Sequence, residues 1–174
     1  MTELTSGARS PENIAWSRWF ARVWLDYVFV AVALGFVIEI VAPQSVLLKS
    51  DFAYPFVLLV GFLSIPGEAA CVAKWGQTPG HWLLALRVTR ADGARLTFDE
   101  AFGRATSASI IGCGLLFPLV SLFTMNAQYK RVRAGRPTSW DEKRGALMLA
   151  APLSDARIRV LVIVVVAMLA LMFF

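Results

Sequence analysis

Long apolar runs alternate with short polar segments along the chain, and this pattern predicts membrane-spanning helices. The four runs cover residues 17–41, 52–73, 105–128 and 158–174. The 20 residues of Arg22–Val41 would form a helix of about 30 Å, the thickness of the hydrocarbon core of a bilayer. We therefore expect an all-α membrane protein with about four hydrophobic helices.

The polar segment between the second and third runs predicts a small cytoplasmic β-hairpin. Residues 84–89 alternate apolar and polar side chains, as a half-buried strand does. Asp92-Gly93 is a strong signal for a two-residue hairpin turn, and residues 95–98 would form the returning strand.

The third run is expected to be broken. Thr97 and Glu100 have the spacing of a capping box, which predicts the start of a helix leading into this run. Gly112, Gly114 and Pro118 then interrupt the apolar pattern. The run either crosses the membrane or is re-entrant, dipping in and returning on the same side, as irregular backbone buried in protein can do.

The positions of lysine and arginine favour the re-entrant alternative. Cytoplasmic loops of membrane proteins carry an excess of these residues, and eight of the 17 lie between residues 128 and 159. If the third run crossed, a cytoplasmic N-terminus would leave this most basic segment outside. We therefore predict a multi-pass protein of the plasma (inner) membrane with a cytoplasmic N-terminus.

The amino-acid composition further limits the class of protein and the partners that can be expected. Hydrophobic residues make up 57% of the chain and charged residues 17%, against roughly 45–50% and about 25% in soluble domains. The net charge is +5, but no basic run is interleaved with base-stacking aromatics, so no nucleic-acid partner is expected. The single histidine and the two cysteines lack the spacing of a metal site, so we expect no metal and no cofactor.

Charged side chains inside the apolar runs are the candidate functional residues, because an isolated charge in a bilayer is costly. On an ideal helix Arg22 and Asp26 share a face one turn apart, and Arg18 continues that face. Glu68, in the second run, lies at about the same depth as Asp26. Either an Arg–Asp pair neutralises itself and holds two helices together, or the carboxylates bind protons or cations.

Two motifs outside the apolar runs resemble those of the RDD family, which is named for one arginine and two aspartates. One follows the second run and the other precedes residue 148; their residues are Gly76, Thr78, Pro79, Gly80, Thr138, Trp140 and Asp141. The resemblance divides the chain into an RDD-like membrane domain, 1–148, and a C-terminal extension with the fourth helix, 149–174.

The resemblance implies roles for individual residues. It maps the two family aspartates onto Asp26 and Asp141, and it leaves Arg18 and Arg22 as alternatives for the arginine. Glu68 matches an acidic position of one subgroup. For at least one member of the family, cation/proton antiport is implied, and transport is generally suspected.

Together these observations predict a small-ion transporter that exchanges cations for protons through a cluster of Arg18, Arg22, Asp26, Glu68 and Asp141. Four spans are few for a monomeric transporter, so we expect a homo-oligomer whose other partners are the lipid bilayer, monovalent cations and protons. The alternative is a non-transporting scaffold or accessory subunit whose basic loops dock a partner protein or anionic lipid. An enzyme is disfavoured because no Gly-x-Gly-Asp or Gly-x-Ser-x-Gly motif is present.

Overall fold

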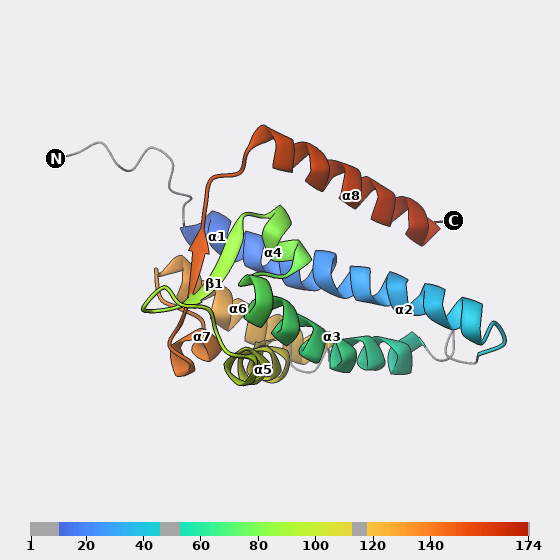
Figure 1. Cartoon of the computed structure of the whole chain (residues 1–174), viewed down its shortest axis with the longest axis horizontal. Helices are drawn as coiled ribbons and strands as arrows, with labels where there is room; N and C mark the ends of the chain where they lie inside the picture. The colour runs from blue at the N-terminus through green and yellow to red at the C-terminus, as the bar shows by residue number, and fades with distance from the viewer. Residues whose placement is uncertain (1–10, 46–52, 113–117, 174) are drawn as a thin grey trace.

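The computed structural model describes residues 11–45, 53–112 and 118–173. The first apolar run is one continuous helical segment, in which a π-helical stretch separates two α-helices. Its parts are α1 (Pro11–Phe20), η1 (Ala21–Asp26) and α2 (Tyr27–Val41). The second run is α3 (Ala53–Trp75), which continues through Pro66. Figure 1 shows α2 and α3 extending together away from the end of the molecule that carries the sheet.

Among the described helices, α3 is the one that is long and apolar enough to cross a bilayer, over 21 residues from Pro55 to Trp75. By the same criteria of length and composition, α2 is a shorter apolar helix. The last run forms α8 (Asp155–Phe173). The expectation of a mostly helical protein is therefore confirmed, whereas the crossing of the membrane by four helices stays a prediction.

The third run is broken, since Thr124 Oγ1 donates to Gly112 O at 2.8 Å, although one straight helix would separate positions 112 and 124 by about 18 Å. It forms α5 (Phe98–Ser107), a second π-helical stretch η4 (Ala108–Gly112), and α6 (Pro118–Arg133). Residues 113–117, which include Gly114, lie outside the described residues. The capping box is confirmed: Thr97 N donates to Glu100 Oε2 at 2.8 Å, and Thr97 Oγ1 accepts from Glu100 N.

The predicted β-hairpin is wrong. Residues after α3 form α4 (Pro79–Leu83) and β1 (Leu86–Arg90), and residues after α6 form α7 (Ser139–Lys143) and β2 (Ala146–Ala150). β1 pairs antiparallel with β2, a segment that the sequence pattern places inside the basic loop.

The reason for this difference lies just after the predicted turn. The turn at Asp92-Gly93 does form, since Ala94 N donates to Asp92 Oδ1 at 2.9 Å and Gly93 has φ +83°. However, α5 begins at Phe98, and Leu96 is buried in the core. Too few residues remain for a returning strand, so β1 takes a partner from the other end of the chain.

The segments α4–β1 and α7–β2 share one plan, 60 positions apart. Thr78 and Thr138 each precede a five-residue helix, and Ala85 (φ +53°) and Gly145 (φ +59°) each lead into a five-residue strand. The register pairs residue 86 with 150, 88 with 148 and 90 with 146. A pseudo-two-fold axis therefore passes through the centre of the sheet.

The sheet lies against the ends of the helices. Its inner face contributes Val88 and Ala146 to a core with Val72 of α3 and Ala101 of α5. A second core joins η1, α4 and β1, and α8 packs against it through side chains that include Leu161. The predicted boundary after residue 148 therefore falls within β2, and α8 packs on the domain that precedes it.

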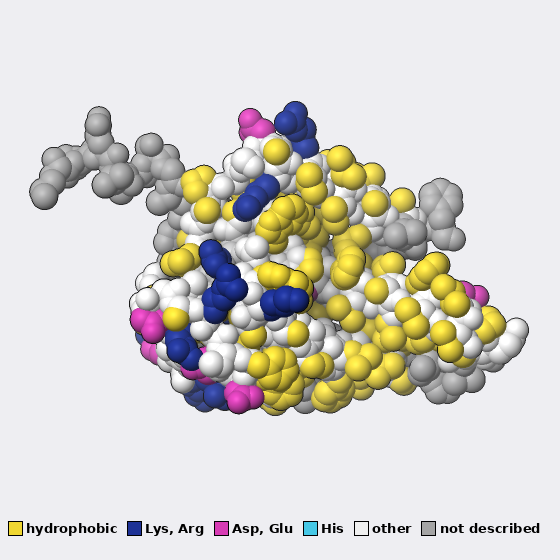
Figure 2. All heavy atoms as spheres, viewed as in Figure 1, with side chains coloured by type: hydrophobic (Ala, Val, Ile, Leu, Met, Phe, Trp, Pro, Cys, Tyr) yellow, Lys and Arg dark blue, Asp and Glu magenta, His cyan; other side chains and the backbone are white. Residues whose placement is uncertain are grey.

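Charged and apolar side chains separate along the length of the molecule. In Figure 2 most of the Lys and Arg side chains lie around the end that carries the sheet, which we call the sheet end. The opposite half of that view is mainly hydrophobic. Large apolar side chains of α2 and α3 are well exposed, among them Phe36 (67%) and Phe62 (59%). Such a surface is suited to lipid rather than to water.

Candidate functional site

A buried arginine that sequence reasoning missed, Arg104, organises the charged residues. In α5 the buried side chains are Ala101, Arg104 and Ala105, and Ala108 follows at the start of η4. Their spacing is that of one helix face, and Arg104 is only 2% exposed. A charge on an otherwise apolar helix face was the signal in the sequence, and it predicts a buried partner.

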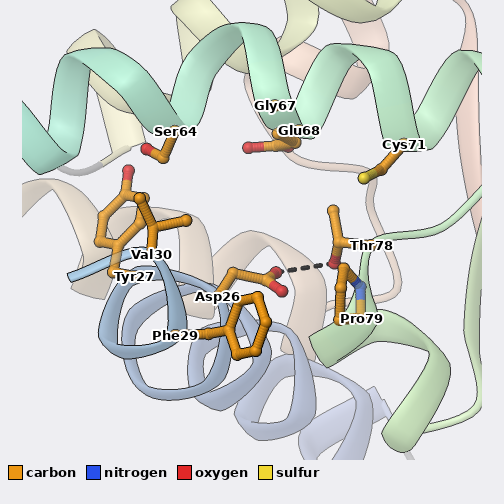
Figure 3. Close-up of a pocket in the computed structure, with 10 residues that line it drawn as sticks. All are labelled: Asp26, Tyr27, Phe29, Val30, Ser64, Gly67, Glu68, Cys71, Thr78 and Pro79. Atoms are coloured by element: carbon orange, nitrogen blue, oxygen red, sulfur yellow. Dashed lines mark hydrogen bonds between the residues drawn. The ribbon is translucent and has the colours of Figure 1, made fainter. Parts of the chain in front are cut away.

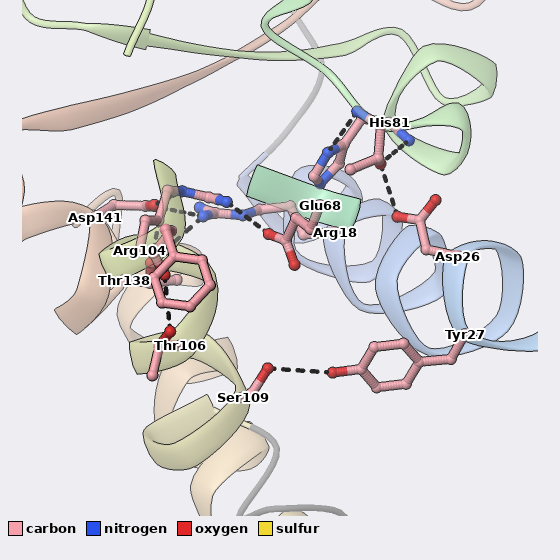
Figure 4. Close-up of polar contacts among 12 residues, drawn as sticks. Arg18, Asp26, Tyr27, Glu68, His81, Arg104, Thr106, Ser109, Thr138 and Asp141 are labelled. Atoms are coloured by element: carbon pink, nitrogen blue, oxygen red, sulfur yellow. Dashed lines mark hydrogen bonds and ion pairs between the residues drawn. The ribbon is translucent and has the colours of Figure 1, made fainter. Parts of the chain in front are cut away.

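Arg104 connects α3 to Asp141 of the second motif (Figure 4). Its Nε donates to Asp141 Oδ1 at 2.7 Å, and its Nη1 donates to Glu68 Oε1 at 2.9 Å. On the other side of Asp141, Oδ2 accepts from Arg18 Nη2 and from Thr138 Oγ1, the latter at 2.7 Å. We call Arg18, Glu68, Arg104 and Asp141 the ion network; it joins α1, α3, α5 and α7.

The ion network contains two positive and two negative side chains. Asp141 is 1% exposed. Burial alone would raise the pKa of its carboxyl group, but Arg104 and Arg18, with the hydroxyl of Thr138, hold that pKa far below its ordinary value. Asp141 therefore remains ionised at physiological pH and acts as a fixed negative charge between two arginines.

Asp26 contacts α4. Its Oδ2 accepts from Thr78 Oγ1 at 2.7 Å, and its Oδ1 accepts from Gly80 N at 2.8 Å. Gly80 allows this approach, because a Cβ there would lie 2.7 Å from the carbonyl oxygen of Ala21. The expected pair of Asp26 with Arg22 is not tested, since the side chain of Arg22 lies outside the described residues.

Asp26 and Glu68 line one cavity between η1–α2 and α3 (Figure 3). The cavity has a volume of about 140 Å³. Its full lining consists of Asp26, Tyr27, Phe29, Val30, Ser64, Gly67, Glu68, Cys71, Thr78 and Pro79. Glu68 is therefore common to the cavity and to the ion network. Among the described residues, no group of three or more His, Cys, Asp or Glu side chains is arranged to hold a metal ion.

The motif that follows α3 contributes Thr78 and Pro79 to the lining of the cavity. Gly76 ends α3 with φ +74° and accepts a hydrogen bond from Val88 N at 2.7 Å. Thr78 caps α4 by accepting from His81 N at 3.1 Å, while His81 Nδ1 accepts from Thr78 N at 3.4 Å. The buried His81 thus completes the capping box. Pro79 occupies the first turn of α4, where its missing N–H costs nothing.

In the second motif, the aromatic ring of Trp140 packs onto η4. A Cβ at Gly112 would lie 2.7 Å from Cζ3 of Trp140, so the ring packs directly on the backbone of η4. Also in η4, Ser109 Oγ lies 3.5 Å from the hydroxyl of Tyr27, which follows η1. The two π-helical stretches are thereby connected, and such stretches are frequent at functional sites.

A model of the RDD family matches residues 14–142 of the chain. The chain belongs to the RDD family. RDD proteins are typically membrane proteins, in agreement with the apolar α3. Searches among curated proteins and among solved structures found no match. The range that matches the RDD model contains all four residues of the ion network as well as Asp26.

The contacts described above bring Asp141 to Arg18 and Arg104, and Asp26 to α4. Arg18, one of the two candidate arginines, contacts Asp141, which the resemblance maps onto a family aspartate. Asp26 lies at α4, and together with Glu68 it lines the cavity. Sequence reasoning placed Asp26 and Glu68 at matching depth, and both line the cavity, but it did not foresee Arg104 between Glu68 and Asp141.

Proposed function

We propose that this RDD protein is a transporter of the plasma (inner) membrane that exchanges small monovalent cations for protons. The observation that carries the proposal is the cavity that Asp26 and Glu68 line from two different apolar helical segments. A carboxylate in such surroundings binds a proton or a cation because either one offsets the cost of desolvating its charge.

The ion network suggests how occupancy of the cavity would be sensed. Glu68 donates no hydrogen bond as a carboxylate, and its charge interacts with Arg104 at 2.9 Å. A cation or proton arriving at Glu68 would compete with that interaction. Because Asp141 holds Arg104 from its other side, the change would be transmitted to α5 and α7. In this proposal Asp141 and Arg18 position Arg104 and do not carry the ion.

Flux measurements in proteoliposomes test this proposal. We expect Asp26→Asn and Glu68→Gln to abolish pH-dependent cation flux at a temperature at which each variant is still folded. Glu68→Gln should also lower the thermal unfolding temperature, because it breaks the buried ion pair with Arg104. Glu142→Gln is the matched control, since Glu142 lies on the surface with its side chain 61% exposed. Parent protein without flux, or Asp26 and Glu68 variants with parental flux, would contradict the proposal.

We further propose that the sheet end is cytoplasmic and that the third run is re-entrant. The pairing of β1 with β2 supports this topology, because it brings the segments after α3 and after α6 to one end. The basic last turn of α6, with Lys130, Arg131 and Arg133, lies next to that end, as expected of a cytoplasmic flank. The N-terminus would then also be cytoplasmic, since α1 starts at the sheet end (Figure 1).

Cysteine labelling in oriented vesicles tests the topology. In a background of Cys71→Ser and Cys113→Ser, we expect Asp92→Cys and Arg136→Cys to react with an impermeant maleimide from the same side. Labelling of position 136 from the opposite side to position 92 would exclude a re-entrant third run. An added cysteine at Gln44, after the far end of α2, provides the reference for the other side.

The second candidate function is a scaffold that docks on anionic lipid or a partner protein. It is favoured by basic–aromatic pairs near the sheet end: Lys74 Nζ lies 5.1 Å from the ring of Trp75, and Arg157 lies 5.6 Å from that of Trp82. Both rings are about half exposed, and such pairs suit a headgroup interface. Stoichiometric co-purification of another protein would favour this function, whereas an ion-dependent thermal shift would favour transport.

A further inference from the structure

The outer edge of β1 forms hydrogen bonds with neighbouring residues of the same chain. The N–H groups of Val88 and Arg90 point away from β2. They donate to Gly76 O at 2.7 Å and to Ala94 O at 2.8 Å. These bonds occupy the positions at which a further strand would pair, so this edge cannot extend the sheet.

Among the residues that the structure describes, none pairs with the outer edge of β2. The bonds from Ala91 N to Gly145 O and from Ala151 N to Ala85 O flank the ladder. The alternation of antiparallel pairing then directs the N–H and C=O groups of residues 146, 148 and 150 outward. In the described part of the chain, no group donates to or accepts from these outward groups. The pseudo-symmetry of the sheet is therefore broken at this edge.

The sequence of β2 is self-complementary. It reads Ala-Leu-Met-Leu-Ala, which is a palindrome about Met148. In an antiparallel pair of two such strands centred on Met148, alanine faces alanine, and Leu147 of each copy faces Leu149 of the other. An interface with two-fold symmetry requires this reciprocity, because each residue must meet its partner twice.

The charge and the exposure of β2 also fit pairing with a second copy of the same strand. No residue between Arg144 and Asp155 is charged, so a second copy of β2 brings no like charges opposite each other, and its acidic end approaches the basic end of the first. Leu147 and Leu149 are 42% and 53% exposed on the outer face of the sheet. Natural proteins usually protect an open apolar edge with lysine, proline or a bulge, and β2 has none of these.

We propose that β2 pairs with β2 of a second copy of this chain, giving a four-stranded sheet in the order β1–β2–β2–β1. The two-fold axis would stand perpendicular to the sheet at Met148. Because the inner face of the sheet packs on the ends of the helices, both copies would have the same orientation in one membrane. The pairing adds main-chain hydrogen bonds from residues 146, 148 and 150 and covers the four leucines.

Disulfide formation between copies tests both the interface and its register. In the Cys71→Ser/Cys113→Ser background, differently tagged Leu147→Cys and Leu149→Cys chains are co-expressed in full length and oxidised. We expect a mixed disulfide dimer, since directly opposite residues in this type of pair have Cα atoms about 4.5 Å apart. Each variant expressed alone should cross-link at least tenfold less, because diagonal positions lie about 7–8 Å apart.

A proline substitution tests the edge itself. Ala150→Pro removes an outward N–H but none of the hydrogen bonds to β1, so we expect a monomer in nanodiscs with a parental unfolding temperature. Ala150→Val, the control, should remain a dimer. Absence of the mixed disulfide, a dimeric Ala150→Pro variant, or a monomeric parent would overturn the proposal. A monomeric parent would also be the result if another protein or residues 1–10 occupied this edge.

Discussion

Replacing Asp141 with asparagine is expected to lower the free energy of unfolding by about 3–5 kcal/mol, the usual cost of breaking a buried ion pair from one side. The variant leaves Arg18 and Arg104 buried, with side chains 12% and 3% exposed, without the negative charge that both contact. The measurement is thermal or denaturant unfolding of the purified protein in detergent.

Glu142→Gln is the control for this prediction, because it removes a carboxylate from the same short helix. Glu142 pairs with Arg131 at 2.5 Å, but its side chain is 61% exposed, so we expect a loss of about 0–1 kcal/mol. Equal losses in the two variants would mean that the ion network does not hold the helices together.

The low pKa of Asp141 fixes the sign of its effect on pH stability. Its carboxyl releases its proton more readily in the folded than in the unfolded protein. The stability that it contributes is therefore fully present above an ordinary aspartate pKa of about 4, and it is lost as the pH falls below that value. Between pH 5 and pH 8 this contribution should stay constant.

The helices could be predicted from the sequence because long apolar runs leave few alternatives. The same holds for the break in the third run, where Gly112 and Pro118 interrupt the pattern, and for the capping box of α5. These are local signals, in which residues close in sequence decide the structure. The membrane location of the protein rests on the same runs and on its membership of the RDD family.

The pairing of β1 with β2 could not be predicted in this way. Asp92-Gly93 gives a real turn, but which strand follows depends on contacts between segments 60 positions apart. The apolar stretch 146–150 follows Lys143 and Arg144 and looks like part of a basic loop. Its strand forms because Ala146 and Met148 complete the core beneath the sheet, a requirement that appears only once the helices are packed.

Several residues of the candidate site could be named from the sequence, but most of the contacts between them could not. Asp26 and Glu68 line one cavity, as their matching depth suggested, and Arg18 contacts Asp141. The missing member was Arg104, because it lies at the border between a polar segment and an apolar run, where a basic residue usually reaches the surface. Only the packing of α5 against α3 shows that this arginine points inward.

Replacing Arg104 with methionine should therefore have an effect as large as that of Asp141→Asn. At neutral pH we expect a loss of about 3–5 kcal/mol, because Glu68 and Asp141 keep buried negative charges that Arg104 no longer neutralises. Removal of Arg104 also takes away the larger of the two charge interactions that lower the pKa of Asp141. That pKa should rise relative to the parent.

The pH response separates this electrostatic role from simple packing. As the pH falls below about 4, the parent loses the stability that Asp141 contributes, and the Arg104→Met variant, with its higher Asp141 pKa, should lose less of it. Its deficit relative to the parent should therefore shrink, whereas a packing defect would leave the deficit unchanged. Arg131→Met is the control, since its partner Glu142 is exposed. In the double variant Arg104→Met/Asp141→Asn, the loss should be smaller than the sum of the single losses by about 0.5–3 kcal/mol. Strict additivity would mean that the two side chains, although 2.7 Å apart, do not stabilise the fold as a pair.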